Sequence, residues 1–263
     1  MRALSILLLS MLGLLTACGG HSSAPSKSVS GSYEFVVASN VTGGVTLVES
    51  NLTASGTQSS ASGSSQVQVL SFESKNWYLN GVCAGASPGE NSVSANITGT
   101  SVGLTLDDGG NAISGQGVLT GSTITGNYSV LGSTCPDLQN RLGYPAGYDT
   151  GGIVGNVVPA LAGTFAGSLN IPEGTHNASL TLTENPDYSL TASLALAGPV
   201  DNGTFTLTGS SVGNVMFVSG QVNSSTLTLF GYFDRAGLYT KFPNSLLVFN
   251  YDTQSTAGLL IGQ

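Results

Sequence analysis

Residues 188–196 read YSLTASLAL, and along them apolar side chains alternate with small polar ones. Leu190, Ala192 and Leu194 fall on one side of an extended chain, and the hydroxyl side chains between them fall on the other. A period of two is typical of a β-strand with one buried and one solvated face. Residues 203–208 (GTFTLT) repeat the pattern, so this region predicts two neighbouring strands of an antiparallel sheet.

Segments of this kind recur along the chain after residue 30, separated by short stretches rich in Gly, Ser and Asn. Their close spacing predicts an all-β fold of antiparallel meander strands. One helical turn is predicted at residues 135–139 (CPDLQ), with Pro at its first position. The predicted strands are residues 33–38, 45–54, 66–72, 76–79, 92–98, 102–106, 112–119, 123–131, 163–169, 178–183, 189–196, 203–208, 215–222, 226–233, 246–251 and 259–261.

Three collinear matches suggest that the strands form two similar halves. The matches are ITGTSVG (97–103) with LTGSSVG (207–213), SGQ (114–116) with SGQ (219–221), and STIT (122–125) with STLT (225–228). Such blocks in the same order indicate an internal repeat, although chance similarity in a chain rich in Ser, Thr and Gly stays an alternative. We expect each half to be a small β-barrel or sandwich, and the alternative is one larger β-barrel formed by both halves.

The predicted boundaries follow from these patterns. The first β repeat covers residues 31–135, and the second covers 161–263. Residues 136–160 between them are rich in Gly, Pro and Tyr, which predicts a linker.

The N-terminus has the features of an export signal. Arg2 precedes an apolar run, residues 4–15, that is too short to span a bilayer, and small residues follow it. Residues 15–18 (LTAC) resemble the lipobox of bacterial lipoproteins. The resemblance implies cleavage after residue 17 and a lipid anchor on Cys18, and Gly19, where an Asp would imply inner-membrane retention, implies the outer membrane. An ordinary signal peptide that is cleaved near this point is the alternative.

The segment that follows the signal, residues 18–30, is rich in Gly and Ser and predicts a flexible tether. Residues 31–82 are similar to envelope lipoproteins inferred from bacterial genomes, for which no activity is established. This resemblance implies a location in the cell envelope and no mechanism.

If Cys18 carries the lipid, Cys83 and Cys135 remain as a pair in an oxidising compartment. We expect them to form one disulfide. A metal-binding or nucleophilic role is less favoured, because neither cysteine has a neighbouring His or the spacing of a ligand motif.

Charge excludes nucleic acid as a partner. Only 8% of the residues are charged, the net charge is -8, and the 6 Lys and Arg residues do not cluster. Binding to phosphates requires clustered Lys and Arg. No cofactor motif is present in the sequence, and we expect none to be bound.

Several polar residues are candidates for chemistry. Asp107, Asp108 and Asn111 could suggest a Ca²⁺ site, but they lack the alternating ligands and the distal Glu of an EF-hand, which favours a hairpin turn. His176 lies near Glu173 in a turn-rich segment, and a lone His with one carboxylate is weak evidence for catalysis, so we expect a surface turn.

Glycosidase chemistry would need two carboxylates that face each other. The sequence does not show which acids approach one another, and we expect scattered, solvated side chains at Glu34, Glu49, Glu73, Glu90, Glu173 and Glu184. An aromatic sugar platform is the further possibility, with ordinary packing as its alternative, at Trp77, Tyr78, Tyr144 and Tyr148.

The sequence thus favours a lipid-anchored cell-envelope protein with a non-enzymatic structural, adhesive or interaction role. The alternative is a β-barrel that binds a small apolar ligand or a glycan. A hydrolase that uses Glu173 with His176 is the least favoured hypothesis.

Overall fold

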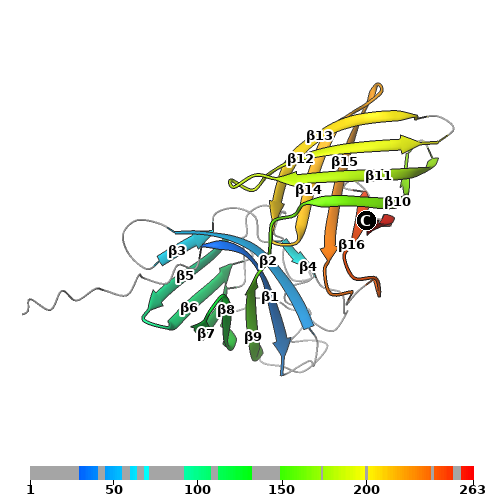
Figure 1. Ribbon diagram of the computed structural model, residues 1–263. Helices are drawn as coiled ribbons and strands as arrows, with labels where there is room; N and C mark the ends of the chain where they lie inside the picture. Colours follow the sequence, from blue (N-terminus) through cyan, green and yellow to red (C-terminus); the bar gives the residue numbers. More distant parts are fainter. Residues whose placement is uncertain are drawn as a thin grey trace, which may run out of the picture.

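The computed structural model describes most of the chain after residue 29. The described residues are 30–40, 45–54, 60–63, 68–70, 92–107, 112–131, 149–172, 174–198, 201–237, 240–250 and 256–263. All regular structure in these ranges is β-strand, and all strand pairs are antiparallel (Figure 1). The predicted all-β fold is confirmed.

The strands form two separate bodies. The first is a nine-stranded sheet in the order β1-β9-β8-β7-β6-β5-β3-β2-β4, in which β1 also pairs with β2. The pairings therefore run from β1 through β9, β8, β7, β6, β5, β3 and β2 back to β1, and the β2–β3 link is short, with Thr53 opposite Ser62 and Ala54 opposite Ala61. Its strands are β1 (Gly31–Ser39), β2 (Val45–Ala54), β3 (Ser60–Gly63), β4 (Gln68–Leu70), β5 (Ser92–Thr98), β6 (Ser101–Asp107), β7 (Ala112–Thr120), β8 (Thr123–Leu131) and β9 (Asp149–Val157).

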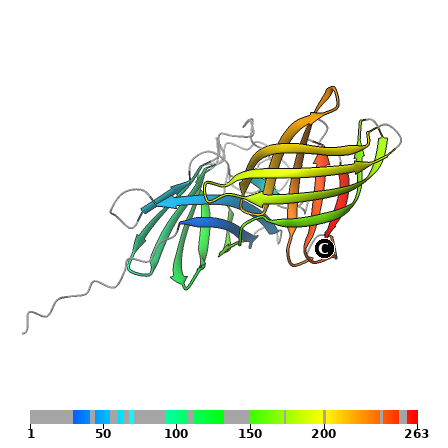
Figure 2. The same ribbon diagram turned by 45° about the horizontal axis from the view of Figure 1, so that its top comes forward.

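The second body is a closed barrel in which each strand pairs with the next and the last pairs with the first (Figure 2). The chain therefore makes two β bodies, as predicted, and not the one larger barrel of the alternative. The strands of the closed barrel are β10 (Gly163–Ile171), β11 (Gly174–Glu184), β12 (Ser189–Ala197), β13 (Gly203–Val212), β14 (Val215–Val222), β15 (Ser225–Asp234), β16 (Ser245–Asn250) and β17 (Thr256–Gly262).

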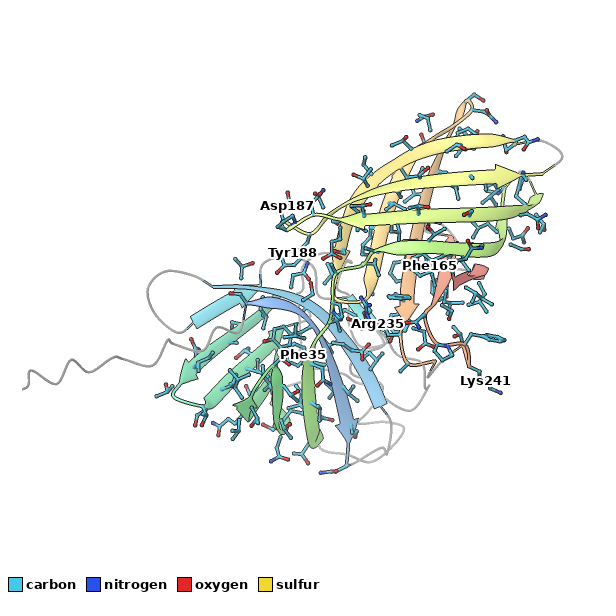
Figure 3. All side chains as sticks on the ribbon, in the orientation of Figure 1. Phe35, Phe165, Asp187, Tyr188, Arg235 and Lys241 are labelled. Carbon is cyan, nitrogen blue, oxygen red and sulfur yellow. The ribbon has the colours of Figure 1, made fainter. Side chains whose placement is uncertain are left out.

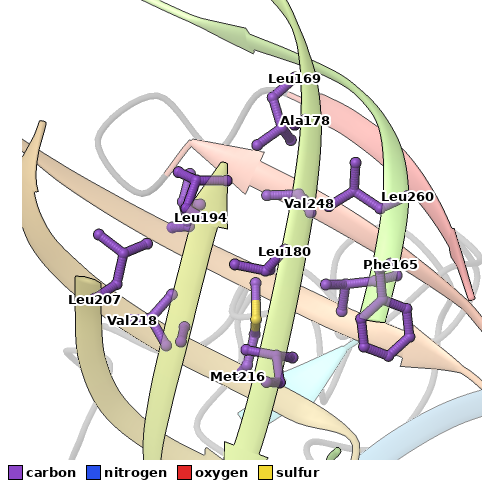
Figure 4. Close-up of a cluster of buried hydrophobic side chains, with 14 of the residues drawn as sticks. Phe165, Leu169, Ala178, Leu180, Leu194, Leu207, Met216, Val218, Val248 and Leu260 are labelled. Carbon is purple, nitrogen blue, oxygen red and sulfur yellow. The ribbon is translucent and has the colours of Figure 1, made fainter. Parts of the chain in front are cut away.

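The interior of the closed barrel is packed with large aliphatic side chains (Figure 4). Leu190, Ala192, Leu194 and Leu196 of β12 are all buried, which confirms the face predicted from their alternation. The side chains of this core keep between 0% and 6% of their surface exposed. A space for a ligand would leave the side chains around it exposed to that space, so the described core is filled by the chain itself.

The stretch predicted as a linker contains a strand. β9 pairs with both β1 and β8, so the first body extends to Val157 and the connection is residues 158–162. Two glycines of β9 have a packing role, because a Cβ at Gly155 would overlap the ring of Phe35 and one at Gly151 would overlap the backbone of Ala38. Glycine in a strand commonly marks such a close approach.

Two of the sequence matches fall on equivalent hairpins, and one does not. SGQ and the block after it lie on the β7–β8 hairpin in the first body and on the β14–β15 hairpin in the second. Residues 97–103, however, form the β5–β6 turn, whereas most of 207–213 lies within β13. The repeat is therefore visible at the level of hairpins rather than along each half.

The two bodies meet through the outer faces of two hairpins, β1–β2 and β14–β15. Leu47 of β2 packs against Val215 and Tyr232 of the barrel. Val36, Phe217 and Phe230 extend this small apolar cluster. Polar residues lie beside it, and they form the junction described next.

Candidate functional site

Glu34 and Glu49 lie directly opposite each other in the register of the β1–β2 hairpin. Their neighbours Tyr33 and Phe35 are buried and stack on each other, while the two glutamates point to the outer face that meets the barrel. Glu49 has 0% of its surface exposed, and Glu34 is half-buried. The structure thus brings together two of the six acids that the sequence predicts to be scattered and solvated, and that prediction is wrong for this pair.

Asn214, at the β13–β14 turn of the barrel, binds both carboxyl groups. Its backbone N–H donates to Glu49 Oε2 at 2.8 Å, and its side-chain Nδ2 donates to Glu34 Oε2 at 2.9 Å. The hydroxyl of Tyr232 donates to the same Glu34 oxygen at 2.8 Å. Groups from the barrel therefore hold side chains of the first sheet, and hydrogen bonds to charged groups are among the stronger ones in proteins.

The turn that carries Asn214 fits closely against the first sheet. Gly213 is the first of its two loop residues and has a φ of 58°, as a type II′ hairpin turn requires. Its N–H donates to Asn51 Oδ1 at 3.1 Å, and Asn51 Nδ2 donates to the carbonyl of Ser211 at 2.7 Å. A Cβ at Gly213 would overlap the Glu49 carboxyl, so only glycine fits at this position.

Arg235 joins the same junction from the end of β15, where it lies between the two bodies (Figure 3). Its Nε donates to Asn214 Oδ1 at 2.8 Å, and one terminal nitrogen donates to the carbonyl of Pro159 at 2.6 Å. Its guanidinium also stacks on the ring of Phe233, 4.4 Å from the centroid. Burial lowers the pKa of Arg235, while the nearby Glu184, Glu34 and Glu49 act in the opposite direction.

The surroundings of Glu49 favour its protonated form. Burial raises the pKa of this carboxyl well above its ordinary value, and the nearby Glu34 raises it further. The N–H of Asn214 and the charge of Arg235 lower this pKa by less. Glu49 Oε1 has no donor among the described residues. Two ionised carboxylates cannot hydrogen-bond to each other, but with one proton Glu49 can donate to Glu34.

The chemistry open to this pair is limited by access. A catalytic acid or base must come within hydrogen-bonding distance of its substrate. Glu49 has no exposed surface, and the barrel covers it through Asn214 and Gly213. As arranged here, Glu49 is closed off from solvent, and the pair joins the two bodies.

A second buried polar cluster corrects the prediction for His176. This residue belongs to β11, its side chain is 1% exposed, and it lies on the same face as Ala178 and Leu180, so the prediction of a surface turn is wrong. Its Nδ1 donates to the carbonyl of Gly174 at 3.0 Å, and the N–H of Asp201 donates to its Nε2 at 3.4 Å. Both ring nitrogens are therefore hydrogen-bonded inside the barrel.

Asp201 extends this cluster toward the β14–β15 turn. Its Oδ1 accepts a hydrogen bond from Asn223, and its Oδ2 has no donor within the described part of the chain. Glu173, the residue that the hydrolase hypothesis pairs with His176, lies outside the described residues. That hypothesis thus stays a prediction, although Asp201 rather than Glu173 is the acid seen next to His176.

Glu184 also differs from its prediction as a solvated acid. It is half-buried, and its Oε2 accepts a hydrogen bond from the N–H of Leu161 at 2.7 Å. It therefore holds the connection between the two bodies at Leu161.

The remaining candidates are mostly outside the described residues. Asp107 ends β6, and the residues that follow it are not described, so neither the Ca²⁺ site nor the hairpin turn is tested. Within the described ranges, no group of three or more His, Cys, Asp or Glu side chains could hold a metal ion. Outside these ranges lie Cys18, Cys83, Cys135, Glu73, Glu90, Asp108, Asn111, Trp77, Tyr78, Tyr144 and Tyr148.

Comparison with protein-family models, with curated proteins and with solved structures found no match for this chain. In the part of the chain that the structure describes, no helix has the length and hydropathy to cross a membrane.

Proposed function

We propose that this chain is a lipid-anchored protein of the cell envelope, in which two β bodies joined as one unit serve a non-enzymatic structural, adhesive or interaction role. The observation that carries the proposal is the junction. The half-buried Glu34 of β1 and the buried Glu49 of β2 are bound by the β13–β14 turn, and an apolar cluster packs beside them. A scaffold or adhesive module needs its parts held in a fixed relation, and this junction supplies that relation.

The packing of the barrel supports a scaffold over a ligand carrier. Eight-stranded barrels either fill their interior with side chains or enclose one small ligand. Here the core, from Leu161 to Leu260, is filled. A small apolar ligand inside this barrel is therefore the weaker alternative, and a glycan would have to bind outside this core.

The location rests on the N-terminal sequence. The lipobox-like residues 15–18 support an anchor on Cys18, residues 18–30 provide the tether, and the anchor would make the membrane a partner. An oxidising envelope compartment would allow the expected disulfide between Cys83 and Cys135.

Intact mass and fatty-acid labelling of the chain from its own membrane test the anchor. We expect a lipid-modified mass that begins at Cys18, and we expect Cys18→Ser to abolish the label. Cys83→Ser is the matched control and should keep it. An unlipidated mass, or a label that survives Cys18→Ser, would contradict the proposal.

The interaction role is tested separately by photo-crosslinking in cells. The probe is placed at Val118 or at Ile261, which are 50% and 44% exposed on the two bodies, and Leu194 in the barrel core is the buried control. We expect envelope components to be captured from at least one exposed site and none from Leu194. Capture from neither exposed site would count against the interaction role.

A further inference from the structure

We propose that the junction between the first sheet and the barrel is a proton-controlled joint, closed while Glu34 and Glu49 share one proton and loosened when the pair loses it. This inference concerns the joint alone and does not depend on the anchor or on the proposed function.

The geometry gives the pair little freedom to avoid repulsion. Glu34 and Glu49 are cross-strand neighbours in β1 and β2, and like charges directly opposite each other destabilise a sheet. Glu49 cannot turn toward solvent while the barrel is docked, because Gly213 and Asn214 cover it. Loss of the shared proton would therefore place two negative charges together in a buried space.

The charged and titratable groups around the pair do not offset a second negative charge. The first sheet contributes the two glutamates themselves, and the barrel contributes the Tyr232 hydroxyl, which donates to Glu34. The one cation that acts on Glu49 among the described residues is Arg235, which also lies close to Glu184. One guanidinium would thus face three carboxylates if Glu34, Glu49 and Glu184 were all ionised.

The direction of the pH effect follows from the raised pKa of Glu49. Between the ordinary carboxyl pKa of about 4.3 and the raised value, the docked state holds a proton that the separated state has released. The free energy that favours docking is therefore largest in acid and falls as pH rises through the raised pKa. Above the raised pKa, Glu49 is ionised in both the docked and the separated state. The free energy of docking then no longer changes with pH through this group.

The connection between the bodies is placed to act as the pivot. Residues 158–162 join β9 to β10, and they are held at Val158 by the carbonyl of Ser32 and at Pro159 by Arg235. Arg235 also donates to Asn214 within the barrel, so the residue that holds the connection is hydrogen-bonded to the turn that binds Glu34 and Glu49. A change at the β13–β14 turn can therefore reach the connection.

Hydrogen exchange of the full chain across a pH series tests the joint. The readouts are the protection factors, corrected for intrinsic exchange, of the Gly213 and Asn214 amides, which donate to Asn51 and Glu49. As pH rises, we expect both to fall by about tenfold for each unit that the Glu49 pKa lies above its unfolded value. The Leu194 amide in the barrel should keep its protection over the same series.

Glu49→Gln is the deciding variant, because glutamine keeps the shape of the protonated side chain and cannot ionise. In it, the protection of Gly213 and Asn214 should be independent of pH and should match the acid value of the natural chain. Asp187→Asn removes an equal charge from a fully exposed site and should leave the natural pH dependence unchanged.

A second variant, Glu34→Gln, keeps the test decisive if Glu49→Gln does not fold. Removal of the Glu34 charge lowers the pKa of Glu49, so the pH at which protection is lost should move down. Protection that does not change with pH in the natural chain would overturn the proposal. An unaltered pH dependence in whichever of the two glutamine variants folds would overturn it as well.

Discussion

The core of the closed barrel and the junction between the two bodies are both buried, but they are stabilised in different ways. The barrel core is apolar, and because apolar burial is non-directional, many side chains contribute to its stability. The junction relies on directional hydrogen bonds from one turn, and a buried polar group that loses its partner is costly. The stability of the barrel is therefore shared by many side chains, whereas the relation between the bodies depends on a few residues and, in our proposal, on one proton.

Leu194→Ala should have the largest effect on stability. This side chain is fully buried in the barrel core, and a Leu→Ala change in a core costs about 2–5 kcal/mol. Urea unfolding followed by the barrel's amide signals is the measurement. Thr191→Ala, on the exposed face of the same strand, should cost about 0.5 kcal/mol or less. Similar losses of unfolding free energy in both variants would show that the apolar core does not determine the stability of the barrel.

Gly213→Ala should act on the junction rather than on the core. Its positive φ costs an alanine about 1–2 kcal/mol, and the overlap with the Glu49 carboxyl adds about 1–3 kcal/mol. Gly121→Ala separates the two causes, because Gly121 has a φ of 63° in a two-residue loop and nothing within 4 Å of its Cβ position.

The measurement for this glycine pair is urea unfolding, together with exchange at the β13–β14 turn. The larger loss of unfolding free energy should occur in Gly213→Ala, and the Asn214 amide should be less protected from hydrogen exchange in this variant. Equal losses would mean that the fit between the turn and the first sheet is unimportant.

Asn214→Ala should have a smaller effect than Gly213→Ala. It removes the side-chain bonds to Glu34 and from Arg235, while the backbone bond to Glu49 can remain. Because hydrogen bonds to charged groups contribute about 1.5–3 kcal/mol, we expect the free energy of unfolding to fall by an amount in that range. Thermal unfolding of the variant measures it.

The control for this change is Asn156→Ala, since Asn156 accepts one exposed hydrogen bond from Thr123. Its unfolding temperature should stay close to that of the natural chain. If the two asparagine variants behaved alike, Asn214 would not be the link between the bodies.

The sequence predicts the fold well where the pattern is local. The alternation in β12 and β13 predicts both strands and the buried face, and the two-body division follows from repeated hairpin blocks. The sequence prediction fails at β9, because this strand is rich in glycine, as a loop would be, and one of these glycines, Gly155, accommodates Phe35. His176 could have been placed correctly, since it continues the alternation of Ala178 and Leu180.

The junction is harder to predict, because it depends on residues far apart in the chain. Glu49 and Asn214 are separated by 165 positions, and no local pattern links them. The one available signal is an acid in the middle of each strand of the β1–β2 hairpin, at Glu34 and Glu49. That signal indicates a polar outer face, but it does not show that a second body covers it.

The most direct test of the central claim is an NMR titration of the side-chain carboxyl carbons of Glu49 and Glu34 in the full chain. We predict that Glu49 titrates well above the ordinary carboxyl value of about 4.3, and that the Asn214 amide signal shifts with the same midpoint. Glu49→Gln should remove that transition from the Asn214 signal. A Glu49 carboxyl that titrates at or below the ordinary value, with an Asn214 signal that does not follow it, would contradict the shared proton and the joint built on it.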